Sequence, residues 1–425
     1  MAFDIHAPSR RELLLSSGVL FAWTCLPKRA LADGRDPRLL VMILRGALDG
    51  LAAVPPIGDP DWVRLRGDKA LTSAPGQQGA ASALALDSFF ALNPAMPNLQ
   101  RMYRAGQATV VHAVASPYRE RSHFDGQDVL ESGLVRPGAA DSGWLNRALA
   151  GLDSAGQVSP KGREAFAVGP VTPLVVRGSA PVMSWTPPRL PPPTDTTVMR
   201  LLDLYRHTDP ALARVLEERM DLAAIARAGG MDQPAKPGQP AGQAAGSALP
   251  GAQQRKYFAD SAGAAARFLA RPDGPRIGAL SFDGWDTHAD EGAANGRLAT
   301  LLGALDGALA AVETDVGAAW RETVVAVVTE FGRTARINGT EGTDHGTATI
   351  ALLAGGAVKG GRVIADWPGL KDADLHDRRD LKPTTDLRAV LKGVLRDHVR
   401  VDETALAGVV FPDSGSVNPM GGLVG

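Results

Sequence analysis

The stretch that decides the fold is "VVAVVTEFGRTARINGTEGTDHGTATIALLAGG", residues 324–356, in which a polar loop joins two apolar runs. Both runs are continuously apolar and rich in β-branched residues, which is typical of strands buried on both faces. Glu330 follows the first run directly, and Asp344 and His345 stand just before the second. A carboxylate and an acid–imidazole pair between two buried strands predict a functional site, provided that other strands bring polar residues to the same edge.

The rest of the chain supplies the other strands of such a sheet. Together with the two runs above, the predicted strands occupy residues 39–44, 108–115, 166–176, 276–282, 323–329 and 347–354. Between the runs at 276–282 and 323–329, residues 298–312 carry leucines and a valine at helical spacing. Strands that alternate with helices predict one α/β domain over residues 33–425, a three-layer sandwich with a central, mainly parallel sheet.

Two segments interrupt this alternation. Residues 150–270 indicate an irregular insertion between two halves of the core. Within it, residues 229–253 are low in complexity and lack large apolar side chains. Because such a stretch cannot bury enough surface to order itself, we expect a flexible loop there.

Residues 1–32 carry the features of a secretory signal. An arginine pair at 10–11 is followed by leucines and a short apolar stretch, and residues 30–32 read A-L-A. The pair is typical of the twin-arginine route, which exports folded proteins, so we expect a periplasmic or secreted protein that meets the twin-arginine translocase during export. The only cysteine, Cys25, lies in this segment, which leaves the mature chain without disulfides or thiolate ligands.

Charge and hydropathy exclude several partners. The chain has 425 residues and a formal net charge of −1, which gives no electrostatic reason to expect nucleic acid or an acidic membrane as a partner. The apolar stretch in the signal is too short to cross a bilayer, and we expect no membrane span in the mature chain.

Polar side chains gather where the predicted strands end, which is where ligands bind in open parallel sheets. In chain order they are Asp49, Ser116, Arg119, Ser122, His123, Asp286, His288, Glu330, Arg333, Asp344 and His345. Oxygen and imidazole donors without a thiolate suit zinc, manganese, magnesium, calcium or iron. Two groups of such ligands would hold two ions for a displacement at phosphorus or sulfur.

Each candidate also has a structural interpretation. Asp49 can form a turn, and Glu330 can pair with Arg333. Ser122 stands where a strand's loop becomes a helix, so its hydroxyl can act as a nucleophile or as an N-cap. Arg119 can bind an oxyanion or remain an ordinary surface arginine.

Several motifs together resemble one exported bacterial family, domain of unknown function 1501. They are "LRGALDGL", "HAVASPYRERSHFDGQDVLESG", "GWLNR", "GWDTH", "EFGRT", "NGTEGTDHG", "GGAVKGG" and "PTTDLRAVL", and the resemblance runs from about residue 36 to 412. The family resembles a branch of the alkaline phosphatase and sulfatase superfamily. That resemblance implies an alkaline-phosphatase-like sandwich with a two-metal centre at the carboxyl edge of the sheet.

Carried over residue by residue, the resemblance makes Ser122 the nucleophile, with Ser116 as the alternative. It implies Asp49, Asp286, His288, Glu330 and His345 as metal ligands. One departure stands out: Phe331 follows Glu330 where the superfamily has a histidine, so the metal centre can be altered, single or absent. Asp344 and His123 are the candidates to replace the lost ligand.

Two functions follow from these expectations. The first is metal-dependent hydrolysis of a small anionic ester, a phosphate or a sulfate, with Arg119 or Arg333 balancing charge on the non-bridging oxygens. The second is a non-catalytic binding or assembly protein on a degenerate hydrolase scaffold. A metal-free serine esterase is weaker, because the chain has no G-x-S-x-G motif.

Overall fold

The structure is a computed structural model. It describes scattered positions between 202 and 220 and the ranges 35–73, 82–138, 140–154, 165–168, 173–180, 182–185, 251–272 and 274–425. The expected signal at 1–32 lies outside the described residues, as does the expected flexible loop up to residue 250.

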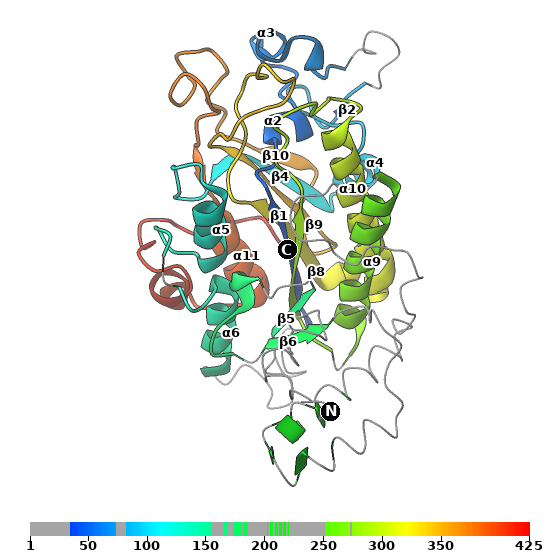
Figure 1. The fold of residues 1–425 in the computed structure, drawn as a ribbon, viewed down its shortest axis with the longest axis vertical. Coiled ribbons are helices and arrows are strands. Elements are labelled where there is room, and N and C mark those ends of the chain that lie inside the picture. The colour runs from blue at the N-terminus through cyan, green and yellow to red at the C-terminus, as the bar shows by residue number, and fades with distance from the viewer. Residues whose placement is uncertain are drawn as a thin grey trace, which may run out of the picture.

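A nine-stranded sheet forms the centre of the protein (Figure 1), in the order β10-β4-β9-β8-β1-β7-β5-β6, with β11 paired to β4. The strands are β1 Arg38–Arg45, β4 Ala108–Ala115, β5 Ala165–Val168, β6 Val182–Trp185, β7 Ile277–Asp283, β8 Thr323–Thr329, β9 Thr349–Ala354, β10 Arg362–Ile364 and β11 Thr385–Asp386. A small antiparallel pair, β2 Leu84–Ala85 and β3 Ala91–Leu92, stands apart.

All pairings in the large sheet are parallel except those of β9, which runs antiparallel to both β8 and β4. The mainly parallel sheet expected from the sequence is therefore confirmed. The antiparallel direction of β9 has a consequence for the site. The strands β1, β7 and β8 run parallel to one another, and β9 begins at the edge of the sheet where they end. The residues just before β9 therefore lie at the same edge as the residues just after β8, β1 and β7.

Helices cover both faces of this sheet (Figure 1). One side carries α4 Pro97–Arg104, α9 Gly251–Ala270 and α10 Arg297–Val316, and the other carries α5 His123–Ser132, α6 Trp144–Ser154 and α11 Leu387–Val394. Shorter helical pieces are α2 Gly50–Ala53, α3 Trp62–Arg66, η1 Gly67–Lys69, η3 Leu174–Val176, η4 Gly317–Glu322, η5 Leu395–Val399, α12 Glu403–Ala405 and η6 Leu406–Val410.

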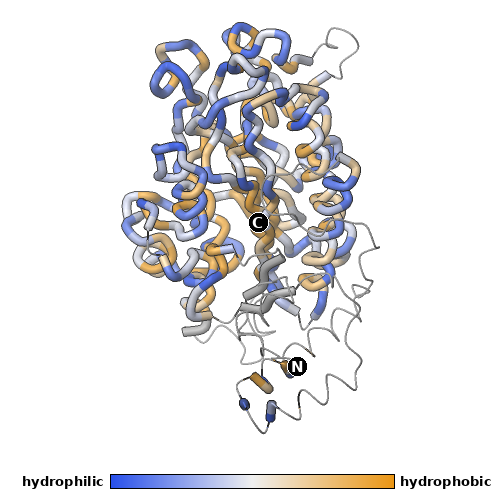
Figure 2. Tube along the Cα trace, in the orientation of Figure 1, coloured by the Kyte–Doolittle hydropathy of each residue, from blue (hydrophilic) through white to orange (hydrophobic). Residues whose placement is uncertain are grey.

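The core lies where the apolar runs of the sequence placed it. Strands β4 and β8 are buried along their whole length. Figure 2 shows orange, the colour of hydrophobic residues, in the central strands. Helix α10 buries the leucines and the valine whose spacing predicted it. Each fully buried leucine contributes roughly 1.5–3 kcal/mol of transfer free energy, so this face holds the helix against the sheet.

The region expected to be an irregular insertion, residues 150–270, is more regular where it is described. Strands β5 and β6 extend the sheet beyond β7, and α9 begins at Gly251, inside the stretch 229–253 expected to be a flexible loop. Helix α9 forms because its apolar residues have helical spacing, which the amino-acid composition of the region does not show. Phe258, Ala262, Ala265 and Leu269 recur every three or four residues and are buried.

None of the helices among the described residues combines the length and the apolar character that a membrane crossing requires.

Two buried histidines are structural. Nε2 of His112 lies 3.0 Å from the carbonyl oxygen of Val54, while its Nδ1 accepts from the N–H of Ala113, at a bulge in β4 where Ala113 has a φ of 53°. Nε2 of His398 lies 2.9 Å from the carbonyl oxygen of Arg38. Burial lowers the pKa of His112 to about 4 and that of His398 to about 4.

These histidines give the metal-free protein an acid-sensitive stability. Unfolded histidines take up protons near pH 6.5, whereas these two stay neutral in the folded protein until about pH 4. The stability is therefore fully present above about pH 6.5 and is lost as the pH falls toward 4. Each contributes about 1.4 kcal/mol per pH unit inside that window.

Denaturant unfolding in the presence of a chelator, repeated between about pH 7 and pH 4, measures this slope. His398→Gln should lower the slope by about 1.4 kcal/mol per pH unit within that window. A slope unchanged by the substitution would contradict the assignment.

Candidate metal centre

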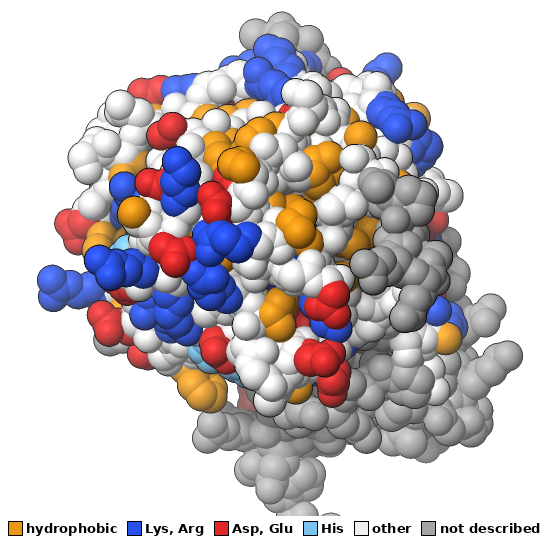
Figure 3. All heavy atoms as spheres, turned by 90° about the horizontal axis from the view of Figure 1, so that it is seen from above, with side chains coloured by type: hydrophobic (Ala, Val, Ile, Leu, Met, Phe, Trp, Pro, Cys, Tyr) orange, Lys and Arg blue, Asp and Glu red, His pale blue; other side chains and the backbone are white. Residues whose placement is uncertain are grey.

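Loops from five strands meet at the carboxyl edge of the sheet. The segments that follow β1, β4, β7 and β8 and the segment that precedes β9 all reach this edge. Figure 3 looks down on the molecule from above, and on the left of the view arginine, lysine and acidic side chains gather around histidine atoms.

His123 is the first residue of α5, directly after the loop that leaves β4. Its Nδ1 lies 2.9 Å from Oε1 of Glu330, and its ring stacks on Phe331 at a centroid distance of 5.1 Å. Phe331, which stands where a ligand was expected, is therefore a packing surface for a histidine supplied by another loop. Nε2 of His123 is buried and has no hydrogen-bond partner among the described residues.

Asp286 comes from the loop after β7 and occupies the middle of the site. It can lie there because Gly46, at the end of β1, has a φ of 117° and packs against the backbone of the 285–286 turn. A Cβ at Gly46 would lie 2.5 Å from the N atom of Asp286. The N–H of Gly46 also donates to Oε1 of Glu330 at 2.8 Å. This glycine thus fixes two carboxylates at once.

His345, on the segment before β9, is oriented by a backbone carbonyl. Its Nδ1 lies 2.8 Å from the carbonyl oxygen of Arg121, which can only accept, so Nδ1 carries a proton and the neutral ring has its lone pair on Nε2. His288 has an equivalent arrangement, with Nδ1 at 3.3 Å from Oδ1 of Asp344, which also accepts from Asn338 at 3.0 Å.

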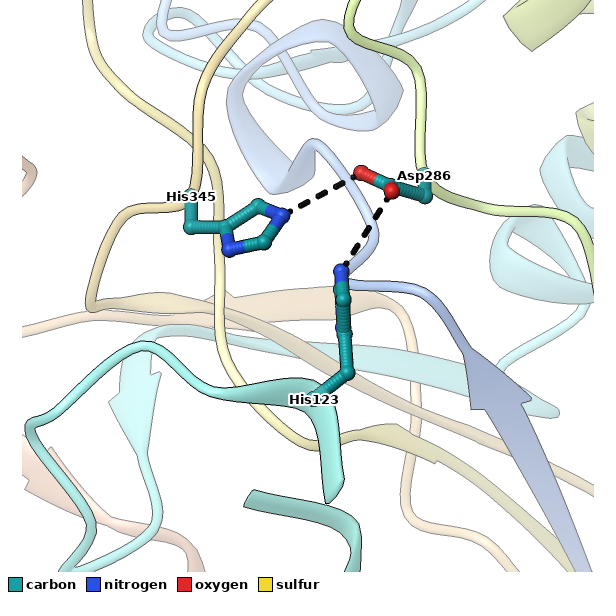
Figure 4. A group of neighbouring side chains, drawn as sticks. All are labelled: His123, Asp286 and His345. Carbon is teal, nitrogen blue, oxygen red and sulfur yellow. Dashed lines mark ion pairs between the residues drawn. The ribbon is translucent and has the colours of Figure 1, made fainter. Parts of the chain in front are cut away.

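The Nε2 atoms of the three histidines converge on Asp286 (Figure 4 shows two of the rings). Oδ2 of Asp286 lies 3.5 Å from Nε2 of His123, and Oδ1 lies 3.4 Å from that of His345 and 3.0 Å from that of His288. The Nε2 atoms of His288 and His345 are 2.9 Å apart. A tetrahedral ion with bonds of roughly 2.0–2.1 Å holds its ligands about 3.4 Å apart. The distances from Asp286 to His123 and to His345 match this spacing, and one donor atom from each of these three residues lies within 4.8 Å of the other two. His288 flanks them.

The charges around the imidazoles also suit a cation. Burial by itself lowers the pKa of His123, but its contacts with Asp286 and Glu330 raise that pKa to about 9. Burial raises the pKa of Asp286, yet His123, His345 and Arg333 together hold it far below its usual range. In the metal-free protein, His123 therefore carries a proton, which an ion would displace on binding.

Glu330 supports the ligands from behind. Its side chain is fully buried, and burial raises its pKa, but hydrogen bonds from His123, Gly46 and Gln127 offset this and keep its pKa below the usual range. A carboxylate that accepts from the Nδ1 of a ligating histidine fixes the ring and strengthens its Nε2 as a donor.

Arg333, expected to face an anion, is buried and already committed. It donates to Oδ1 of Asp286 at 2.6 Å, to Oγ1 of Thr343 at 3.2 Å and to the carbonyl oxygen of Thr343. Its guanidinium therefore positions Asp286 and does not face the solvent side of the site.

Asp49, expected to be the first metal ligand, is not brought into this group. Its oxygens accept from Arg66 at 2.5 and 3.0 Å, and Oδ1 also caps α2 through the N–H of Ala52. Both charged side chains are almost fully buried. Asp49 does not join the histidines because a buried carboxylate needs a positively charged partner, and Arg66 in α3 provides it.

The serines and Arg119 occupy different positions. Ser122 is the N-cap of α5 but makes no side-chain capping bond, and its N–H donates to the Tyr118 hydroxyl at 3.1 Å. Ser116 is buried and donates to the carbonyl oxygen of Glu330. Arg119 donates to the carbonyl oxygens of Ser116 and Tyr118. Of the two serines, Ser122 lies next to a ligand in sequence and keeps its hydroxyl off the helix amides.

Two buried residues of this region gave no signal in the sequence. Glu291 accepts from the hydroxyls of Thr287 and Thr343 at 2.8 and 2.9 Å, and burial raises its pKa to about 8. Arg66 lies in a short helix far from any predicted strand end. Strand-end reasoning cannot find such residues, because neither directly follows a strand.

Comparison with known proteins gives one result. The family model described as "Protein of unknown function (DUF1501)" matches residues 37–410. Neither the curated proteins nor the solved structures contain a match to the chain.

The close approach at Gly46 can be tested against a matched glycine. Gly138 has a similar positive φ of 135°, but no atom of the described residues lies within 4 Å of the place that a Cβ would take, so Gly138→Ala carries the backbone strain alone. Gly46→Ala should lower the free energy of unfolding by roughly 1–3 kcal/mol more than Gly138→Ala, because its Cβ meets the Asp286 backbone. Denaturant unfolding of both variants measures the difference, and equal losses would contradict this role of Gly46.

Proposed function

The chain belongs to the DUF1501 family, and we propose that it is an exported, metal-dependent hydrolase of small phosphate or sulfate esters. The observation that carries the proposal is the convergence of His123, His288 and His345 on Asp286. Each ring presents Nε2 to one point while its Nδ1 is held by a separate acceptor, as in metal sites whose outer partners orient the ligands.

The donor set favours one transition-metal ion over a pair of hard cations. Imidazole suits zinc and iron, whereas magnesium and calcium prefer oxygen ligands. Asp49, the residue that would begin a second ion site, is neutralised by Arg66. The proposal is therefore a single ion held by His123, Asp286 and His345, with His288 as a further donor.

Ser122 is the nucleophile in this proposal. Its hydroxyl stands at the N-terminus of α5 without capping a backbone amide, so the first-turn N–H groups stay available to an anionic ester. An ion held by these residues would act as a Lewis acid, polarising the ester oxygen and favouring loss of the proton from a nearby hydroxyl. Arg333 and Glu330 hold the ligands in place from behind.

The relationship to the alkaline phosphatase and sulfatase superfamily is part of the same proposal. Support comes from the mainly parallel sheet between helical layers and from a site at its carboxyl edge. The arginine pair at 10–11 and the apolar stretch after it support the proposal of a periplasmic or secreted location, with the twin-arginine translocase as the partner during export.

A second function, non-catalytic binding on a degenerate scaffold, is favoured by two contacts. Arg66 pairs with Asp49, and Arg333 donates to an oxygen of Asp286 that would otherwise be free to bind an ion. A site altered in this way can hold an ion for structure or for ligand binding without turnover.

Metal analysis of the mature protein tests the shared part of both functions. Wild type should retain about one transition-metal ion per chain, and Asp286→Asn should weaken binding roughly 100-fold or more, because it removes the carboxylate at the centre. Asp290→Asn changes an exposed carboxylate on the same loop and should retain the ion. Equal retention of the ion in both variants would contradict the proposed metal centre.

Turnover of aryl phosphates and aryl sulfates separates the two functions. Aryl esters are the first choice because Phe124, next to His123, is 88 % exposed and offers an apolar contact. Ser122→Ala should lower kcat by about 10³-fold or more with the ion retained, whereas Ser116→Ala should lower it less than about tenfold. Metal-loaded wild type without turnover would favour the binding function.

A further inference from the structure

Arg121 has an unusual backbone conformation at the edge of the metal centre. Its φ is 60°, in the left-handed region that side chains other than glycine rarely adopt. In this conformation its carbonyl oxygen lies 2.8 Å from Nδ1 of His345. Such a conformation persists only where the surrounding structure holds it.

A buried carboxylate holds Arg121. Its Nε and Nη2 both donate to Oδ2 of Asp380, at 3.0 and 2.7 Å. Nη2 also donates to Oδ2 of Asp377 at 3.0 Å. The two acids differ in burial, since the side chain of Asp380 is fully buried and that of Asp377 is 60 % exposed.

Asp380 also holds the segment that carries His345. Its Oδ2 accepts from Oγ1 of Thr347, two residues beyond that histidine, at 2.8 Å. Backbone hydrogen bonds in both directions between Asp380 and His376 fix the loop that presents the carboxylate. One side chain therefore connects the carbonyl that orients the ring with the segment that carries the ring.

We propose that Asp380 is a positioning residue which, through Arg121, fixes the tautomer and the direction of the His345 ring. With its proton on Nδ1 and donated to Arg121, His345 presents a lone pair on Nε2 toward Asp286. Without the Arg121 carbonyl in place, the ring loses the acceptor that keeps the proton on Nδ1, and a proton on Nε2 blocks a ligand position. This inference rests on the proposed metal centre, although the orientation of the ring can be tested without it.

The experiment compares Asp380→Asn with Asp377→Asn, which changes the other carboxylate bound to the same arginine. In metal-free protein labelled with ¹⁵N-histidine, NMR reports the tautomer of His345, whose signals are identified by their loss in His345→Gln. Zinc titration of the same proteins reports affinity.

We expect the wild type to show His345 protonated on Nδ1. Asp380→Asn should shift the ring toward the Nε2-protonated tautomer and weaken zinc binding by roughly 10–100-fold. Asp377→Asn should change affinity by less than about twofold, because exposed ion pairs contribute little.

Further variants keep the inference open to refutation if Asp380→Asn does not fold. Arg121→Lys retains the charge but loses the two-nitrogen contact with Asp380, and should shift the tautomer in the same direction. In the double variant Arg121→Gly with Asp380→Asn, glycine adopts the positive φ without an anchor, so the tautomer should move back toward that of the wild type.

An unchanged tautomer in Asp380→Asn and in Arg121→Lys would overturn the inference. Equal effects of Asp380→Asn and Asp377→Asn would also overturn it, since they would point to charge alone. If wild type binds no zinc or other divalent ion, the proposed function fails, while the tautomer comparison still decides the positioning role.

Discussion

The carboxylate of Asp286 is the group on which the arrangement of the site depends. Arg333 holds one of its oxygens from within the protein, and three imidazoles face the two oxygens from the other side. A carboxylate that is partly withdrawn from water is stabilised by nearby positive charge. In the metal-free protein the Arg333 guanidinium and a protonated His123 provide that charge, and a metal ion in place of the proton would provide it more strongly.

The fold delivers these groups through a simple topological arrangement. Parallel strands bring their carboxyl ends to one edge, and the reversed direction of β9 adds the segment before it to the same edge. Close backbone contact at Gly46 then allows the loop after β7 to approach the loop after β1. Each histidine is finally oriented by a different acceptor: Glu330, Asp344 or the Arg121 carbonyl.

The sequence was sufficient for the central strands of the sheet and for part of the site, whereas the run at 166–176 was wrong as a single strand, because β5 ends at Val168 and residues 174–176 are helical. Continuous apolar runs predicted β1, β4, β7, β8 and β9 to within two residues at their ends, and strand ends predicted that Asp286 and His345 would be neighbours. It could not show that Arg66 neutralises Asp49, because that contact depends on how the short helix α3 packs against the start of α2. Nor could it show the role of Asp380, which lies far beyond His345 in the chain and reaches it only through Arg121.

X-ray absorption at the metal edge of the protein as purified is the most direct test of the central claim, that these side chains surround one ion. The account predicts a first shell of nitrogen and oxygen at roughly 2.0–2.1 Å for zinc, with outer-shell scattering from at least two imidazoles. That imidazole scattering should decrease in His345→Gln. A shell of oxygen atoms without imidazole scattering, or the same spectrum in wild type and His345→Gln, would contradict it.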